Sequence, residues 1–256
     1  VALGSMQFLL ATAVPVGSVA GLALACLIAI VVTGLFGIFI DWLVIQRFRH
    51  APPMMVLVAT VALGAVVREL IRTLYPQGSN PKAFPTLIDG SFAIGGVVIT
   101  ALGLFIVATA IILVLAVYLV IRYTPLGARI RAVAEDRDIA RLMAIRPNRI
   151  FAATFFIATA VGAVGALFYV SYAGVVRFDF GIQLGLIGFS AAVIGGLGSM
   201  QGAVLGSLLI AGVETLVQAT LAEGASYRLV FGFVLVILVL VLKPSGILGK
   251  PVYVKV

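Results

Sequence analysis

A chain of 256 residues that is 63% hydrophobic and 10% charged, with a mean hydropathy of +1.26, is not a soluble domain, because soluble domains carry about 25% charged residues. Its net charge of +8 gathers at the ends of apolar runs, which favours loops at a membrane surface and argues against a nucleic-acid partner. The one cysteine and the one histidine lie in different segments, so the sequence predicts neither an internal disulfide nor a metal site.

Apolar runs of about 20 residues predict membrane-spanning helices, because such a helix crosses ~30 Å of hydrocarbon and lipid offers free backbone groups no partners. The expected fold is an all-α, polytopic transmembrane bundle that forms a single domain over residues 1–256. The eight predicted membrane segments are Val1–Val14, Ser18–Ile45, Pro52–Tyr75, Val97–Ile121, Phe151–Tyr172, Ile182–Leu197, Gly202–Thr220 and Tyr227–Leu242.

Three further features concern the N-terminus, the loop Pro76–Gly96 and polar residues near the ends of the spans. The first segment looks like the end of a longer span, so we expect a chain that is truncated at its N-terminus. Pro76–Gly96 holds three of the ten prolines, and we expect a loop there with a short re-entrant piece. Asp41 and Trp42 close their span and are expected to anchor it at the membrane interface, while Arg177 and Asp179 lie in an outward loop.

Basic residues predict the orientation of the bundle. The loops around Gln46–Ala51 and Arg122–Ile150 and the C-terminal tail alternate onto one side, and together they hold 12 of the 17 basic residues. Because cytoplasmic loops are enriched in lysine and arginine, we expect these three regions to be cytoplasmic.

The stretch Arg122–Ile150 is a dense charged island, with ten of the chain's 26 charged residues and seven arginines. Its Ala, Arg, Leu, Met and Glu content favours helix. The residue before Pro125 should end the preceding span, Gly127 should allow a turn, and Asp136 or Asp138 should divide the island into two short helices. The second, Arg137–Ile145, interleaves apolar and charged residues and should end at Pro147.

A helix lying at the membrane surface as a positive anchor would explain the arginines of this island. It would not explain Glu135, Asp136 and Asp138 in the middle of the island, beside the small residues Ala132 and Ala140. Small residues permit close approach and mixed charges give a contact its register, so the island is predicted to dock onto a partner protein.

At this point the sequence resembles a known family. TPLGARIRAVAEDRDIARLMAI is similar to the cytoplasmic coupling segment of permease subunits from branched-chain amino acid ABC importers, of the LivH type. SAAVIGGLGSMQGAVLGSLLIAGVETL resembles the glycine-rich hairpin of that family, and KPSGILGKP resembles its C-terminus. The chain departs from the family in lacking a further N-terminal hydrophobic segment with an Asn-Phe-Ala-His-Gly-like stretch.

The resemblance implies a multi-pass permease of the bacterial inner membrane that is not itself an enzyme. ATP and magnesium would bind to partner subunits, and this chain, which has no phosphate-binding Gly-x-x-x-x-Gly-Lys motif, would bind no cofactor. Its partners would be cytoplasmic ATP-binding subunits, a second permease subunit (homologous or identical) and an extracytoplasmic substrate-binding protein. Within the coupling segment 127–145, the candidate docking residues are Gly127, Arg131, Ala132, Glu135, Asp136, Ala140 and Ile145.

The glycine-rich hairpin has two interpretations that the sequence leaves open. Its Gly-x-Gly is a weak dinucleotide-binding signal, because no predicted strand and no acidic partner surround it. Close helix packing and lining of the translocation pathway are the two alternatives. They apply to Gly195, Gly196, Gly198, Gly202 and Gly206.

Glu214 is the one acidic residue well inside a predicted span, so it should face the bundle interior, a cavity or a partner. It would either line the pathway, with Gln218 one turn away, or make a structural hydrogen bond.

Three functions compete at this stage. An ABC importer permease for branched-chain amino acids is favoured, and related permeases for urea or other small amides stay open. A secondary transporter or channel would need ion sites or a proton relay, for which Glu214 alone is thin support. An intramembrane enzyme would need a cluster of reactive side chains that the sequence does not offer.

Overall fold

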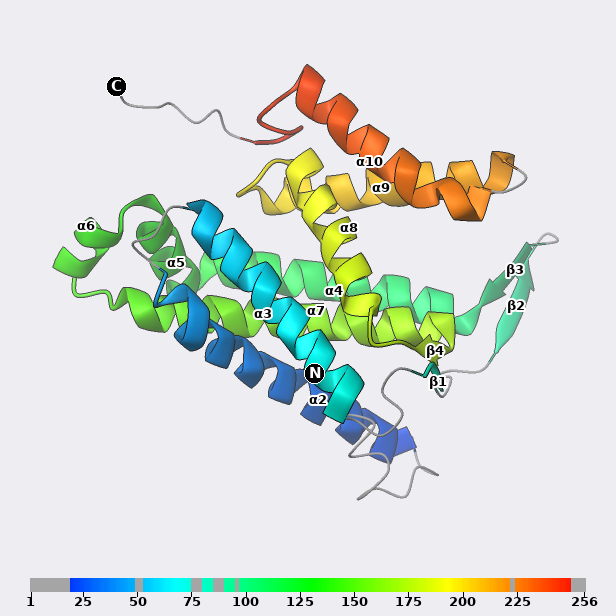
Figure 1. Ribbon diagram of the computed structural model, residues 1–256, viewed down its shortest axis with the longest axis horizontal. Coiled ribbons are helices and arrows are strands. Elements are labelled where there is room, and N and C mark those ends of the chain that lie inside the picture. Colours follow the sequence, from blue (N-terminus) through cyan, green and yellow to red (C-terminus); the bar gives the residue numbers. More distant parts are fainter. Residues whose placement is uncertain are drawn as a thin grey trace. The chain divides into compact units, whose positions relative to one another are not determined.

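The computed structural model describes residues 19–48, 53–74, 80–84, 90–94, 97–221 and 224–249 (Figure 1). The contacts divide the chain into two compact units, one that ends at Asp179 and one that begins at Phe180. The predicted segment Val1–Val14, residues 49–51 of the first basic loop, and the C-terminal tail beyond Gly249 lie outside the described residues.

The first unit contains the helices around the charged island. Helix α4 joins the β2–β3 hairpin at one end to α5 and α6 at the other, and α7 runs beside it (Figure 1). The helices are α2 (Val19–Ile40), which continues as the π-helix η1 (Asp41–Ile45), α3 (Pro53–Leu74), α4 (Ala101–Tyr123), α5 (Pro125–Glu135), α6 (Arg137–Leu142) and α7 (Pro147–Ala173).

Four short strands accompany the helices, so the prediction of an all-α fold is confirmed only as a mostly helical one. Within the predicted loop Pro76–Gly96 the structure describes residues 80–84 and 90–94, and the expected re-entrant piece stays a prediction over the rest. Strand β1 (Lys82–Ala83) pairs antiparallel with β4 (Val175–Val176), and β2 (Ser91–Ile94) pairs with β3 (Val97–Thr100). The span predicted from Val97 therefore begins at Ala101. The β-branched run of β3 favours strand, and the Thr100 hydroxyl then caps α4 by accepting the Gly103 amide at 3.3 Å. The chain is mostly helical.

The second unit is a helical hairpin with a third helix packed on it. It consists of α8 (Phe180–Gly195), α9 (Met200–Thr220) and α10 (Gly224–Leu242). Buried Ala191, Ile194 and Ile210 form its core, against which side chains of α10 pack. The last helix ends at Leu242, immediately before Lys243-Pro244, as predicted.

Among the described residues, four helices are long and apolar enough to cross a membrane: Leu24–Ile45, Ala101–Tyr123, Pro147–Ala173 and Met200–Thr220. Two shorter apolar helices, Phe180–Gly195 and Leu229–Leu242, accompany them. The structure thus supports a polytopic helical membrane protein, and the count of eight segments is not confirmed.

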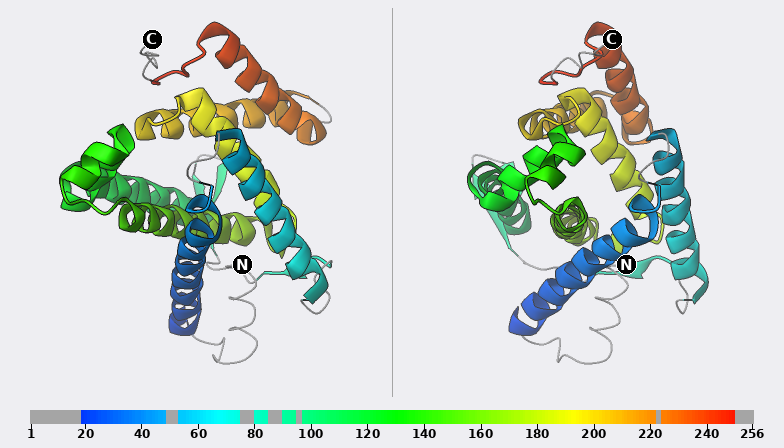
Figure 2. Two further views of the ribbon diagram at one scale, coloured as in Figure 1. Left: turned by 60° about the vertical axis from the view of Figure 1, so that its left-hand side comes forward. Right: turned by 90° about the vertical axis from the view of Figure 1, so that its left-hand side faces the viewer.

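Helices α2 and α7 form the most extensive helix contact of the first unit, and α2 crosses α7 (Figure 2). Glycines make this crossing possible. A Cβ at Gly34 would meet the Phe156 ring at 2.5 Å, and one at Gly37 would overlap the Thr159 side chain. Side chains of α7 thus fill the places that larger residues on α2 would occupy.

The expectation that Asp41 and Trp42 anchor the span together is wrong for Asp41. Trp42 is 55% exposed and stacks with Arg47, but Asp41 is fully buried in the first turn of η1. Sequence position could not separate the two, because adjacent residues of a helix point in directions about 100° apart.

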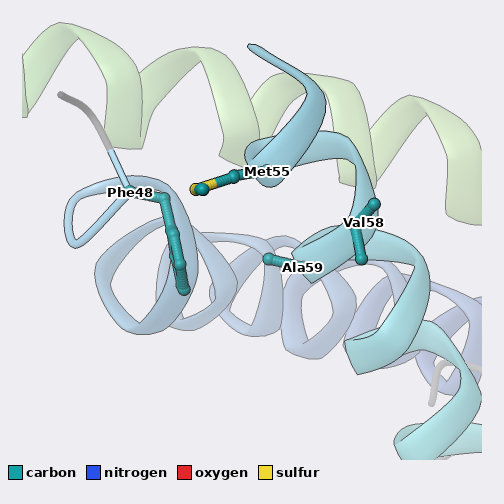
Figure 3. A pocket seen from close by; sticks show the side chains of 4 residues that line it. All are labelled: Phe48, Met55, Val58 and Ala59. Atoms are coloured by element: carbon teal, nitrogen blue, oxygen red, sulfur yellow. The ribbon is translucent and has the colours of Figure 1, made fainter. Parts of the chain in front are cut away.

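A shallow apolar groove of about 410 Å³ lies between the end of η1 and the start of α3. Phe48 faces Met55 across it, and Val58 and Ala59 complete the lining (Figure 3). The lining offers no polar side chain that could orient a ligand.

Candidate coupling surface and glycine hairpin

The charged island folds as two helices that begin at side-chain caps. The Thr124 hydroxyl accepts the Gly127 amide at 3.2 Å, and Pro125 occupies the first position of α5, where its missing N–H costs nothing. Thr124 therefore ends α4 and starts α5, which confirms the predicted break before Pro125.

Gly127 serves close approach rather than a turn. It lies in the first turn of α5 with a φ outside the left-handed region, and a Cβ there would overlap the Ile121 carbonyl oxygen. The Arg131 guanidinium donates to the same carbonyl. One glycine and one arginine thus bring α5 against the C-terminal end of α4 and satisfy one of its free carbonyls.

Asp136 divides the island into two helices. The sequence left Asp136 and Asp138 as the two alternatives for this position. Its backbone ends α5, and its Oδ1 accepts the amides of Asp138 at 2.8 Å and Ile139 at 3.0 Å at the start of α6. The Ile139 and Asp138 amides favour the charged carboxylate and lower the pKa of Asp136 below its ordinary value.

Helix α6 ends at Leu142, three residues before the predicted Ile145. Ala144 has a φ of 60°, and the Ile145 amide returns to the Ala140 carbonyl at 3.1 Å, which closes the helix in a left-handed turn. Pro147 then starts α7 rather than ending α6, because proline suits the first turn of a helix.

A small apolar cluster holds α5 and α6 against the start of α7. Its buried members are Val133, Ala140 and Ile150, and Ile145 packs against them. Ala140 is only 1% exposed, so a larger side chain would separate α6 from its neighbours. Arg137 covers the edge of this cluster with its guanidinium carbon 4.9 Å from the centre of the Phe151 ring.

The predicted docking residues therefore have different environments. Gly127 and Ala140 are buried, Ala132 and Ile145 are partly buried, and Arg131 and Asp136 are exposed but bond to the chain's own backbone. Of the seven, Glu135 alone is exposed without a side-chain hydrogen bond or ion pair to the described part of the chain. Their role in docking stays a prediction, and Gly127, Arg131, Asp136 and Ala140 also shape the segment itself.

The exposed apolar residues of this segment were missing from the predicted docking set. Ile139 is 57% exposed, Met143 69% and Leu142 89%, and the Arg141–Asp138 ion pair of 3.1 Å lies beside them. We call Glu135, Ile139, Leu142 and Met143 the coupling surface. The amphipathic pattern of Arg137–Ile145 indicates that apolar residues occupy one side of this helix. The pattern does not tell which of these residues α5 and α7 cover and which stay exposed.

The hairpin of α8 and α9 is held by backbone-to-backbone contact. A Cβ at Gly195 would overlap the Gly202 carbonyl, one at Gly202 would overlap the Gly195 carbonyl, and one at Gly206 would overlap the Ala191 carbonyl. Gly202 and Gly206 thus place α9 directly on α8. By contrast, Gly181 and Gly185, also spaced four apart, have no atom within 4 Å of such a Cβ among the described residues.

Gly196 and Gly198 have a different role from the other three glycines. Both have positive φ, 101° and 89°, in the four-residue turn between α8 and α9, where side chains are strained. Gly196 also lies against Gly249, and the Ile247 and Leu248 amides donate to the Ile194 and Gly195 carbonyls at 2.8 and 2.9 Å. The KPSGILG turn thereby satisfies the free C-terminal carbonyls of α8.

Glu214 lies on the side of α9 that faces α10. It is partly buried, and its Oε1 lies 3.7 Å from the position that a Cβ of Gly232 would take. Gln218, its predicted partner one turn away, is exposed. The glycine at 232 leaves room for the carboxylate beside α10.

Long apolar helices joined by a capped polar segment, with a glycine-packed hairpin, are the architecture of a multi-pass membrane protein. Residues 1–240 match the family described as the permease component of branched-chain amino acid transport systems. The chain belongs to this family, which confirms the resemblance: it is a permease component of a branched-chain amino acid ABC transport system and a transport subunit rather than an enzyme.

Individual relatives agree with this assignment. The chain is 35% identical over 233 residues to the high-affinity branched-chain amino acid transport permease BraD of Pseudomonas aeruginosa, covering 89% of this chain and 75% of BraD. It is 32% identical over 233 residues to LivH of Escherichia coli K12, covering 89% and 74%. A fructose import permease, FruF of Bifidobacterium longum, is 31% identical over 147 residues, 54% of this chain and 40% of FruF. No solved structure matches the chain.

Proposed function

We propose that the chain forms one half of the membrane domain of an importer that moves branched-chain, hydrophobic amino acids into the cytoplasm by alternating access. Subunits that bind ATP and magnesium would supply the energy, a second permease subunit would complete the pathway, and an extracytoplasmic protein would deliver the substrate. Family membership and the relatives' names support the substrate class. The coupling surface is the observation that supports the ATP-driven mechanism.

The coupling surface has the composition of a docking element. Leu142 and Met143 lie at the end of α6 with most of their area exposed, and the Arg141–Asp138 ion pair lies on the same short helix. Exposed apolar residues with a polar rim mark protein contact sites. The buried cluster of Val133, Ala140 and Ile150 would transmit force from this surface to α7, because packed side chains move together.

The proposed orientation places the coupling surface in the cytoplasm of a bacterial cell, at the inner membrane. Helix α4 has 23 residues, about 34 Å of helix, so its two ends reach opposite faces of the bilayer. The β2–β3 hairpin lies at the other end of α4 (Figure 1), on the side from which the binding protein would approach. The C-terminal tail would share the cytoplasmic side.

The roles proposed for the hairpin glycines and Glu214 follow from their contacts. Gly195, Gly202 and Gly206 would fix α9 on α8, and Gly196 and Gly198 would form the turn. Glu214 would make a structural hydrogen bond where α9 packs on α10 and would not line the pathway, because its carboxylate faces Gly232 of α10.

The substrate has one specific alternative. FruF, which is named as a fructose import permease, matches more than half of this chain, so the shared fold does not select the substrate by itself. Uptake of leucine, isoleucine and valine, with fructose and urea as competitors, decides between the classes.

The experiment is reconstitution of the chain with its ATP-binding subunits, second permease subunit and binding protein in proteoliposomes. We expect ATP-dependent leucine accumulation that excess isoleucine and valine inhibit. Leu142→Glu combined with Met143→Glu should abolish uptake and release the ATP-binding subunits, while the permease still elutes as a folded species. Leu248→Glu, at an exposed apolar residue of the C-terminal turn, is the matched control and should retain both. Uptake that survives the double substitution would rule out the docking proposal.

A further inference from the structure

Asp41 is a fully buried acidic residue in a helix that is long and apolar enough to span a membrane. Its Oδ2 accepts the Gln46 side-chain amide at 2.9 Å, but its Oδ1, shielded from solvent, has no hydrogen-bond partner among the described residues. A buried acceptor without a partner loses its hydration and gains nothing in return. Such a group is expected to find a partner in another conformation of the protein.

The backbone at Asp41 is also unusual. The Gln46 amide donates to the Asp41 carbonyl at 2.9 Å, a bond across five residues that makes η1 a π-helix. A π-turn carries one residue more than an α-turn of the same rise, and such turns are frequent at functional sites. Because of the extra residue, the end of α2 can change its hydrogen-bond register and remain helical.

Helical geometry directs Asp41 toward α7. Viewed down the axis of α2, Asp41 lies between Gly34 and Gly37, because residues four and seven apart share a face of a helix. Gly34 contacts Phe156 and Gly37 contacts Thr159, both on α7, and η1 itself contacts α7 as well as α3. The buried carboxylate is therefore one helical turn beyond the place where the Thr159 side chain meets α2.

The Thr159 hydroxyl can donate a hydrogen bond to a carboxylate oxygen. In the described conformation this hydroxyl donates to the Phe155 carbonyl of its own helix at 2.7 Å. That carbonyl already accepts a backbone hydrogen bond within α7, so the hydroxyl can leave it at small cost. A shift of α7 along α2 by about one helical turn, ~5 Å, would bring the hydroxyl to the carboxylate.

We propose that Asp41 is a positioning residue of the transport cycle, whose free Oδ1 accepts the Thr159 hydroxyl in the second access state. The proposal rests on the proposed function, because α7 begins four residues after Met143 of the coupling surface and would move with it. The described conformation is the state in which Thr159 bonds to its own helix. The Asp41–Gln46 hydrogen bond and the π-turn hold the Asp41 side chain in place while Thr159 changes its acceptor from the Phe155 carbonyl to Oδ1.

The test compares two isosteric substitutions in one helix. Thr159→Val removes the proposed donor and keeps its shape, and Thr154→Val is the matched control, because its hydroxyl also donates to a carbonyl of α7, at 2.8 Å to Ile150. The thermal stability of the assembled importer in lipid nanodiscs is measured without nucleotide and after trapping with ATP and vanadate. Thr154→Val should change the unfolding temperature equally with and without trapping. Thr159→Val should lower the unfolding temperature in only one of the two conditions.

The same variants are then compared in transport. Leaving a buried hydrogen-bond acceptor unsatisfied costs about tenfold in an equilibrium, so Thr159→Val should slow ATP-driven uptake about tenfold. Asp41→Asn should slow it too, and the double variant should be no slower than Thr159→Val alone if the two residues act on each other.

Two results would overturn the inference. One is equal behaviour of Thr159→Val and Thr154→Val in both states, and the other is an effect of Thr159→Val that adds fully to that of Asp41→Asn. In either case, normal wild-type uptake would leave the proposed function standing. A wild-type importer without ATP-driven uptake would contradict the proposed function itself and remove the basis of the inference.

Discussion

The coupling segment between α4 and α7 and the hairpin of α8 and α9 both reverse the direction of the chain, but different atoms hold them together. Side-chain caps from Thr124 and Asp136 and a small apolar cluster hold the coupling segment. Backbone contacts at Gly195, Gly202 and Gly206 hold the hairpin.

This difference follows from the surroundings of each segment. In water, burial of a few apolar side chains stabilises a contact, and polar caps satisfy the helix ends. Between apolar helices in lipid that driving force is absent, so close contact and complete backbone hydrogen bonding must replace it. Substitutions of equal size should therefore have unequal effects in the two segments.

The largest effect is expected in the hairpin. Gly195→Ala puts a methyl group into the Gly202 carbonyl, and because backbone cannot move aside as a side chain can, we expect a loss of about 3 kcal/mol or more of stability. Gly212→Ala in the same hairpin has nothing within 4 Å and should be neutral or stabilising by up to about 1 kcal/mol. Thermal unfolding in detergent measures both, and equal effects would contradict backbone packing as the basis of the hairpin.

A smaller loss is expected in the apolar cluster of the coupling segment. Ala140→Leu overfills a position that is 1% exposed and should cost about 1–3 kcal/mol. Ala134→Leu, at an exposed position of α5, should cost almost nothing. Limited proteolysis between residues 136 and 146 reports the separation of α6, and equal cleavage of the two variants would count against the cluster.

Loss of a cap in the hairpin should have a still smaller effect. Ser199→Ala removes the acceptor of the Gly202 amide, 3.1 Å away, and should cost about 1 kcal/mol. Ser207→Ala is the control, because that exposed hydroxyl donates only to the Val204 carbonyl of its own helix. If both serines tolerate alanine equally in thermal unfolding, the cap contributes nothing to the turn.

The smallest effect is confined to low pH. The pKa of Asp136 is lowered by its two amide donors, so its cap is complete above about pH 4 and weakens as the pH falls through the lowered pKa. The amide proton signals of Asp138 and Ile139 should therefore hold steady from pH 7 to about pH 4 and move below it. Asp136→Asn keeps a cap that does not titrate, and the same movement in that variant would exclude the carboxylate as its cause.

Much of the coupling segment could be predicted because its signals are local. Proline after Thr124 and a run of helix formers around Asp136 mark the helix ends without knowledge of the fold. Which residues face a partner could not be predicted, because the exposure of Leu142 and the burial of Ala140 depend on where α7 lies. The strand β3 was missed for a related reason, since an apolar run of four β-branched residues also suits the start of a span.

The glycines of the hairpin show where sequence patterns stop being informative. Gly181 and Gly185 have the same spacing as Gly202 and Gly206, but within the described part of the chain only the second pair contacts a neighbouring backbone. Spacing predicts that a small-residue face exists, and the path of the chain decides what meets it. Asp41 is a similar case, since its burial depends on the helices packed against η1 and not on its neighbour Trp42.

The central claim, that α6 contacts an ATP-binding subunit, is tested most directly by cysteine cross-linking. Cys26 is the only cysteine, so Cys26→Ser followed by Leu142→Cys places one thiol on the coupling surface, at a position that is 89% exposed. Leu248→Cys in the same background is the control for an exposed thiol outside that surface. We expect a short thiol-to-amine cross-linker to join position 142 of the assembled importer to an ATP-binding subunit, more strongly than position 248. A reactive thiol at 142 that never joins such a subunit would contradict the claim.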